Sequence, residues 1–136
     1  MNTHSKIRPI VNPCAQPFWD ATREDKLLIQ QCEKCKTHIF YPRLFCTECH
    51  SDRLGWVEAS GRGVVYSYTV VHNNSPSAFL ADVPYVVAIV RLDEGVQMCT
   101  NIVDCDPAAV RCDMPVQVVF EALDSEFTLP KFKPAQ

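Results

Sequence analysis

Residues 32–51, CEKCKTHIFYPRLFCTECHS, place two Cys-x-x-Cys pairs on either side of ten residues. Each pair can form a knuckle in which two thiolates converge on one ion and backbone N–H groups point at the sulfur atoms. When a hairpin brings two knuckles together, four sulfur ligands surround the ion tetrahedrally. The spacing therefore predicts a zinc site, with the ligands Cys32, Cys35, Cys46 and Cys49.

Four thiolates fill the coordination shell of zinc, so no metal-bound water remains to be activated. We therefore expect a structural site whose binding energy stabilises a small lobe. Iron can use the same four ligands, because metal identity depends on availability and ligand softness. His38 and His50 lie beside the ligands and are the alternatives for a site of three cysteines and one histidine. A redox-active dithiol would instead need a single pair at the start of a helix.

The composition limits the class of protein. The chain has 136 residues, 47% hydrophobic and 21% charged, which is typical of a globular protein. The formal net charge is -3 and the 13 lysine and arginine residues are scattered, which argues against nucleic-acid binding. No apolar stretch approaches the roughly 18 residues that span a bilayer, and the N-terminus lacks the apolar segment of a secretory signal. We expect a cytoplasmic protein with no membrane partner.

After the cysteine pairs, the hydrophobic pattern becomes that of strands. A turn, Asp93-Glu94-Gly95, joins two of them as a hairpin, and Asp106-Pro107 begins a short helix that ends near Arg111. This order of elements predicts a five-stranded Greek-key barrel of the OB type, with a small sandwich as the alternative. The expected barrel strands cover residues 63–72, 85–92, 96–103 and 116–121.

Before the cysteines, Pro17 suits a first helical position, and a short helix is expected to continue to about Asp25. Leu27, Leu28 and Ile29 then indicate a strand that leads into Cys32. The chain as a whole is predicted to be mainly β. Its expected parts are an N-terminal arm and helix (1–30), a zinc ribbon (31–54), an OB-fold barrel (55–123) and a C-terminal tail (124–136).

Two sets of aromatic residues are candidates for contacts with another molecule. The first lies between the knuckles and could stack on a base or an adenine, or could simply cover the ribbon; it comprises Phe40, Tyr41 and Phe45, with Arg43 beside them. The second is expected to dock a partner protein and comprises Phe18 and Trp19 in the arm and Phe127 and Phe132 in the tail. The segment Gly61-Arg62-Gly63 either holds a phosphate or forms a tight, bulged entry to the first barrel strand.

No group of residues qualifies as a catalytic site. Cys99, Cys105 and Cys112 are expected to pack as small hydrophobic residues, since no base is placed beside them. His72, at the end of the first barrel strand, is expected to be polar surface. These residues predict a binding or scaffolding module.

The whole pattern resembles the DUF35 family over roughly residues 16 to 133. The resemblance is carried by the cysteine spacing together with SGRGVVYS (60–67) and PYVVAIVRLDEG (84–95), supported by PFWDATREDKLLIQQCEKC, YPRLFCTECHS, MPVQVVFE and LPKF. It implies an N-terminal helical arm, a rubredoxin-like zinc ribbon and an OB-fold, and an association with acyl-CoA.

Members of this family are small partners of thiolase-like enzymes, in which the catalytic cysteine and histidine belong to the large subunit. The resemblance therefore implies a non-catalytic subunit that organises the complex and contributes to a CoA site. The preferred partner is the benzoylsuccinyl-CoA thiolase of anaerobic toluene degradation. Candidate contacts with CoA or the partner are Phe40, Tyr41, Arg43, Phe45 and Arg62.

Two other functions stay open. OB barrels and zinc ribbons also bind single-stranded nucleic acid by stacking bases on aromatic residues over a basic groove, but no such charge is evident here. A self-sufficient acyl-CoA enzyme would need a nucleophile and a base that the sequence does not show. The chain also departs from the family at Asp25 and Asp113, where glycine is usual. If these backbones need a positive φ, aspartate is among the few tolerated residues.

Overall fold

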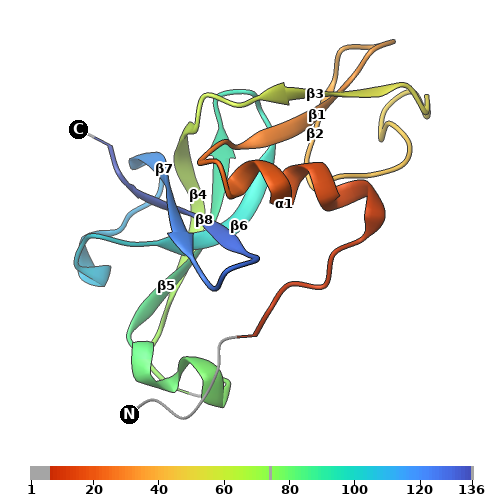
Figure 1. Ribbon diagram of the computed structural model, residues 1–136. Coiled ribbons are helices and arrows are strands. Elements are labelled where there is room, and N and C mark those ends of the chain that lie inside the picture. Colours follow the sequence, from red (N-terminus) through yellow and green to blue (C-terminus); the bar gives the residue numbers. More distant parts are fainter. Residues whose placement is uncertain (1–6, 74, 136) are drawn as a thin grey trace.

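The computed structural model describes residues 7–73 and 75–135, which form a three-stranded sheet, a closed five-stranded barrel and a short helix (Figure 1). The small sheet has the order β2-β1-β3, with β1 at Leu28–Cys32, β2 at His38–Ile39 and β3 at Leu54–Glu58. The barrel strands are β4 (Arg62–Val71), β5 (Tyr85–Leu92), β6 (Gln97–Ile102), β7 (Pro115–Ala122) and β8 (Thr128–Pro134). The helical elements are η1 (Pro13–Ala15), α1 (Gln16–Thr22), η2 (Ser77–Asp82) and η3 (Pro107–Ala109).

The barrel closes in the order β4-β5-β6-β8-β7. Every pair is antiparallel except β6 and β8, which run parallel where Ile102 lies opposite Phe132. This arrangement confirms the predicted five-stranded OB-type barrel. The Asp106 side chain accepts a hydrogen bond from the Ala108 N–H at the start of η3, as the Asp-Pro pattern predicts.

One predicted part of the chain differs from the structure. Residues 124–136 were expected to be a tail, but β8 lies between β6 and β7 and completes the barrel. The prolines of β8 concealed this strand in the sequence, because proline removes a ladder donor and is rarely found inside sheets. The strand β3 (Leu54–Glu58), which starts at the expected ribbon–barrel boundary, pairs with β1 over five positions and so extends the ribbon sheet.

One hydrophobic core joins the arm, the ribbon sheet and the barrel. Phe18 of α1 and Ile29 of β1 pack in the same cluster as Val65, Val90 and Phe132 of the barrel. Phe18 is 1% exposed and Phe132 is 0% exposed, so neither side chain can dock a partner. The prediction for these two residues was wrong, because the helix lies on the sheet and the tail is a core strand.

The two glycines around the start of β4, Gly61 and Gly63, have distinct local roles. Gly61 adopts a φ of 77°, in the left-handed region where a Cβ is costly. A Cβ on Gly63 would overlap the Arg91 carbonyl oxygen of β5. Gly63 therefore permits close approach of two strands. The expected bulge is not at these glycines but between Val65 and Ser67.

Asp25 and Asp113 have φ values of 59° and 66°. Both backbones therefore have the positive φ that was raised as a condition for these positions, and aspartate is among the few residues other than glycine that tolerate it. The expectation for two cysteines was wrong, since Cys99 and Cys112 are exposed. Cys99 lies on the outward face of β6, opposite Ile89. No helix among residues 7–73 and 75–135 is long and apolar enough to cross a membrane.

Candidate functional site

The four predicted ligand cysteines converge at one end of the ribbon sheet. One Sγ atom from each of Cys32, Cys35, Cys46 and Cys49 lies within 4.8 Å of the other three. Two of the Sγ–Sγ distances are 3.5 Å, Cys32 to Cys49 and Cys35 to Cys46. A tetrahedron with Zn–S bonds of about 2.3 Å has edges of about 3.8 Å, so these sulfur atoms fit a zinc ion. Neither His38 nor His50 belongs to this cluster.

The two knuckles have the same backbone geometry. In each, the residue after the second cysteine donates its N–H to the carbonyl of the first: Lys36 to Cys32 and His50 to Cys46. These two residues have φ values of 66° and 63°, which turn the chain back towards the ligands. Further N–H groups point at sulfur, from Cys35 to Cys32 at 3.5 Å and from Glu48 to Cys46 at 3.4 Å. Such donors stabilise thiolates, the form that binds metal.

Local hydrogen bonds also separate the pKa values of the thiols. The Thr37 hydroxyl, and then the Thr37 backbone, lower the pKa of Cys35 to about 6. The Cys35 N–H is the main group that lowers the pKa of Cys32. The Ser51 N–H lowers the pKa of Cys49, but burial and the other three thiols outweigh it and raise that pKa to about 11. A zinc ion would replace these thiol–thiol contacts with four thiolate bonds and supply structural stability rather than reactivity.

The loop between the knuckles, residues 40–45, is divided between core and surface. We call this segment the ribbon loop. Phe40 and Tyr41 are half-buried, and each packs edge-on against Phe18, with ring centroids 5.5 and 5.9 Å away. The Trp19 Nε1 donates a hydrogen bond to the Tyr41 hydroxyl at 2.9 Å. The first half of the ribbon loop thus ties the zinc lobe to α1.

The second half of the ribbon loop points outward. Leu44 is 68% exposed and Phe45 is 58% exposed. The buried side chain of Gln30 in β1 holds this half in place: its Nε2 donates to the Arg43 carbonyl at 3.0 Å, and its Oε1 accepts from the Arg43 N–H at 2.7 Å. The loop therefore presents two adjacent apolar side chains from an anchored backbone, beside the exposed Arg43.

Gln30 and Leu44 were not among the sequence-based candidates. One signal was present, because Gln30 lies two residues before Cys32 and strand residues two apart share a face. A glutamine side chain on the strand face that carries a cysteine ligand can form hydrogen bonds with the backbone of the loop between the ligand pairs. The remaining candidate, Arg62, is exposed at the start of β4, opposite Gln117 of β7, and therefore belongs to the barrel rather than to the ribbon loop.

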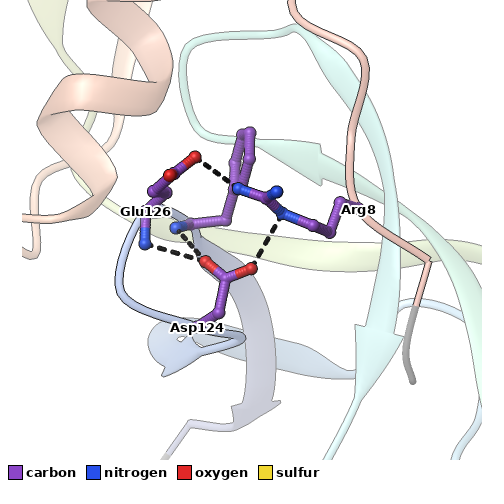
Figure 2. Close-up of polar contacts among 4 residues, drawn as sticks. Arg8, Asp124 and Glu126 are labelled. Carbon is purple, nitrogen blue, oxygen red and sulfur yellow. Dashed lines mark hydrogen bonds and ion pairs between the residues drawn. The ribbon is translucent and has the colours of Figure 1, made fainter. Parts of the chain in front are cut away.

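Trp19 and Phe127 keep part of their surface accessible. Their rings meet edge-on at 5.7 Å and help to line an open hollow of about 520 Å³ between the arm, α1 and the turn before β8. Arg8 closes one side of it. Figure 2 shows the Arg8 side chain between Asp124 and Glu126, with ion pairs to both carboxylates. The Arg8 guanidinium also lies 5.0 Å from the centroid of the Phe127 ring.

The Asp124 side chain accepts hydrogen bonds from backbone groups of the turn before β8. Its Oδ1 accepts hydrogen bonds from the Glu126 and Phe127 N–H groups at 2.8 and 2.9 Å, while its Oδ2 pairs with Arg8 at 2.9 Å. The Glu126 N–H is the main cause of a lowered pKa for the Asp124 carboxyl, and Arg8 adds to it. The arm is therefore fastened to the barrel.

The described part of the chain shows no buried acid–base pair. Its buried polar residues are Thr22, Gln30 and Thr100, none of which titrates. In that part, the four cysteines are the only cluster of His, Cys, Asp or Glu side chains close enough to share a metal ion. The geometry is that of a closed metal lobe with a presented loop.

Comparison with known proteins agrees with this geometry. Residues 19–55 match the family model of the ChsH2 rubredoxin-like zinc ribbon domain, and residues 56–121 match that of the ChsH2 C-terminal OB-fold domain. A DUF35 domain-containing scaffold protein of Methanocaldococcus jannaschii is 36% identical over 110 residues, which cover 79% of this chain and 77% of that protein. The chain belongs to the DUF35 family. Its four convergent cysteines are accordingly the ligands of a structural zinc ribbon.

Two further similar proteins carry the names of an enzyme subunit and of an enzyme complex. A probable enoyl-CoA hydratase alpha subunit of Thermomonospora curvata is 41% identical over 128 residues, or 94% of this DUF35 chain. The chain spans only 40% of that subunit's length. A solved Ltp2-ChsH2(DUF35) aldolase contains a chain with 40% identity and a TM-score of 0.87, over 95% of this chain and 100% of that one.

Proposed function

We propose that this DUF35 chain is a non-catalytic subunit that binds a thiolase-family enzyme acting on acyl-CoA thioesters. The observation that carries the proposal is the pair of exposed apolar side chains, Leu44 and Phe45, on a loop anchored by Gln30. Neighbouring apolar residues at the surface are typical of interaction sites. An anchored loop loses little conformational entropy on binding, which favours affinity.

The relatives support a role within a complex. Scaffold proteins, a hydratase alpha subunit and a chain of an aldolase share this zinc ribbon and barrel. A closed zinc site and the lack of a buried acid–base pair in the described residues agree with a chain that leaves the chemistry to its partner. The partial exposure of Trp19 and Phe127 makes them additional contacts in the proposed complex.

CoA is proposed to bind at the interface of the complex. Phe45 offers a ring face to adenine, and the exposed Arg43 offers a guanidinium to phosphate. Phe40 and Tyr41 contribute indirectly, since their rings pack against Phe18. Arg62 is a separate candidate on the barrel, and comparing Arg43→Ala with Arg62→Ala in CoA titrations of the complex distinguishes the two positions.

The test is co-expression with a thiolase-family enzyme from the same genome. We expect the two proteins to co-elute on gel filtration, and the enzyme to lose thiolysis activity when the small chain is omitted. Benzoylsuccinyl-CoA is the first substrate to assay. Separate elution together with unchanged activity would reject the proposal.

A matched pair of variants tests the ribbon loop. We expect Leu44→Ser with Phe45→Ser to weaken the complex at least about tenfold, because truncating a central apolar anchor commonly costs more than 1 kcal/mol. The control is Ile7→Ser with Ile10→Ser, which removes exposed apolar surface from the arm, where these residues are 65% and 94% exposed. Equal weakening by both variants would argue against the ribbon loop as the specific contact.

A further inference from the structure

The first barrel strand, β4, extends well beyond its neighbour β7. β7 pairs with β4 only from Arg62 to Val64, and two backbone hydrogen bonds of Val65 with Asp113 and Met114 end the contact. β5 continues alongside β4 as far as Val71. Figure 1 shows the hairpin of β4 and β5 reaching away from the barrel towards η2.

A bulge explains why β4 leaves β7. The register with β5 shifts between Val65 and Ser67, which places an extra residue, Tyr66, in β4. A bulge bends its strand and increases its twist. From Tyr66 to Val71, β4 is paired on one side only within residues 7–73 and 75–135. We call this segment, YSYTVV, the open edge.

In an antiparallel ladder, alternate residues direct their N–H and C=O groups to opposite sides of the strand. The open edge therefore presents unpaired backbone groups on the side away from β5. Natural proteins protect such edges with charged residues or proline, because an unprotected edge pairs with other chains. The open edge contains no charged residue and no proline, and its tyrosine, threonine and valine residues favour strands.

The side chains beside the open edge are suited to a second strand. Tyr66 is 51% exposed and lies under the Arg91 guanidinium, 5.2 Å from its ring centroid. Tyr68 is 38% exposed and lies opposite the buried Ala88. Aromatic and β-branched residues in neighbouring strands stabilise each other across the pair.

We propose that the open edge of β4 accepts an extended strand of the partner enzyme, which adds to the sheet by main-chain hydrogen bonds. This inference rests on the proposed function, because the edge is too small to hold a complex alone. A six-residue strand is about 20 Å long and buries an area on the order of a few hundred Å², whereas a stable interface buries about 1,200 Å² or more. Edge-to-edge pairing with a second copy of this chain would bury the same small area, which falls short of that of a stable dimer.

A partner that is already bound at the ribbon loop removes this difficulty. The β4–β5 hairpin lies at the other end of the molecule from the ribbon sheet (Figure 1). A tethered partner that extends from the ribbon sheet to this hairpin brings its strand to the open edge at a high effective concentration, so even a weak pairing contributes to the complex. Main-chain pairing supplies the affinity, and the side chains of Tyr66 and Tyr68 supply the selectivity.

Amide hydrogen exchange of the complex with the co-expressed thiolase-family enzyme tests the proposal. Peptides that cover residues 66–71 are expected to exchange at least about tenfold more slowly in the complex than in the isolated chain. If the complex forms and these amides exchange as in the isolated chain, the edge proposal fails while the proposed function stands. If no complex forms, both fail.

Lysine substitutions provide a second test. Ser67→Lys with Thr69→Lys puts two charges on the exposed side chains of the open edge and is expected to weaken the complex about tenfold without lowering the melting temperature. The control, Ala108→Lys with Ala122→Lys, adds the same charge at exposed positions elsewhere and is expected to bind normally. Equal binding by both variants overturns the proposal. Dimerisation of the isolated chain that the Ser67/Thr69 variant abolishes would identify a second copy as the occupant and likewise overturn it.

Discussion

The Gln30 side chain forms two hydrogen bonds with the backbone of Arg43, one as donor and one as acceptor. The two bonds satisfy the N–H and C=O groups of Arg43, which belongs to no strand pair among the described residues. Gln30 is 4% exposed, so both bonds are shielded from water. The relationship joins the central strand of the ribbon sheet to the segment that presents Leu44 and Phe45, and therefore links the stability of the lobe to its proposed contact surface.

Replacing Gln30 with alanine is expected to lower the free energy of unfolding by about 1–3 kcal/mol, because the backbone groups of Arg43 lose their partners. It is also expected to weaken binding to the partner enzyme, since Leu44 and Phe45 lose their fixed position. Chemical denaturation and titration calorimetry measure the two effects. Gln31→Ala is the matched control: the Gln31 side chain bonds the Lys36 carbonyl in a more exposed setting. A loss for Gln31→Ala equal to that for Gln30→Ala would contradict this role.

Replacing Cys46 with serine is expected to remove bound zinc and unfold the ribbon. Cys46 is 1% exposed, and a structural zinc site of this type supplies on the order of 10 kcal/mol of apparent binding energy. Metal analysis and thermal unfolding of the purified protein check both effects. Cys112→Ser, at an exposed cysteine outside the cluster, should keep full metal content. Retention of zinc and of the melting temperature by Cys46→Ser would disprove the ligand assignment.

Alanine at Gly63 is expected to destabilise the barrel by about 2–3 kcal/mol, because the added methyl group would force β4 away from the Arg91 carbonyl of β5. Gly55→Ala is the comparison. There the nearest atom is the flexible Glu33 side chain at 3.6 Å, and the change is expected to cost less than about 1 kcal/mol. Urea unfolding of both variants measures the difference, and similar costs would show that close approach at Gly63 is not the reason for glycine.

The turn before β8 is expected to lose stability in acid. The folded pKa of Asp124 lies below its ordinary value of 3.8, so the unfolded chain binds this proton more readily. The stability that Asp124 provides is therefore fully present above about pH 3.8 and is lost as the pH falls through the folded pKa. Unfolding of the wild type and Asp124→Asn from pH 2 to 7 tests this. We expect the difference between them to shrink in acid, and a constant difference would contradict the assignment.

The zinc site and four of the five barrel strands, β4 to β7, could be predicted because their signals are local. Paired cysteine spacing determines which thiols can share an ion, and side chains that alternate between two faces mark strands such as β7. Both signals depend on residues close together in the chain. The family resemblance, rather than a local pattern, drew attention to Asp25 and Asp113, and both adopt a positive φ, which aspartate tolerates better than most residues.

The sequence alone thus determined the metal lobe, its four ligands and the OB class of the barrel. The tertiary structure decided which aromatic residues are surface and which are core: Phe18 and Phe132 are buried because α1 and β8 pack into one cluster, whereas Phe45 is exposed. It also decided that Gln30 holds the ribbon loop and that β4 continues past β7 as an open edge. Burial and strand pairing depend on residues far apart in the chain, so no local pattern of residue types could reveal them.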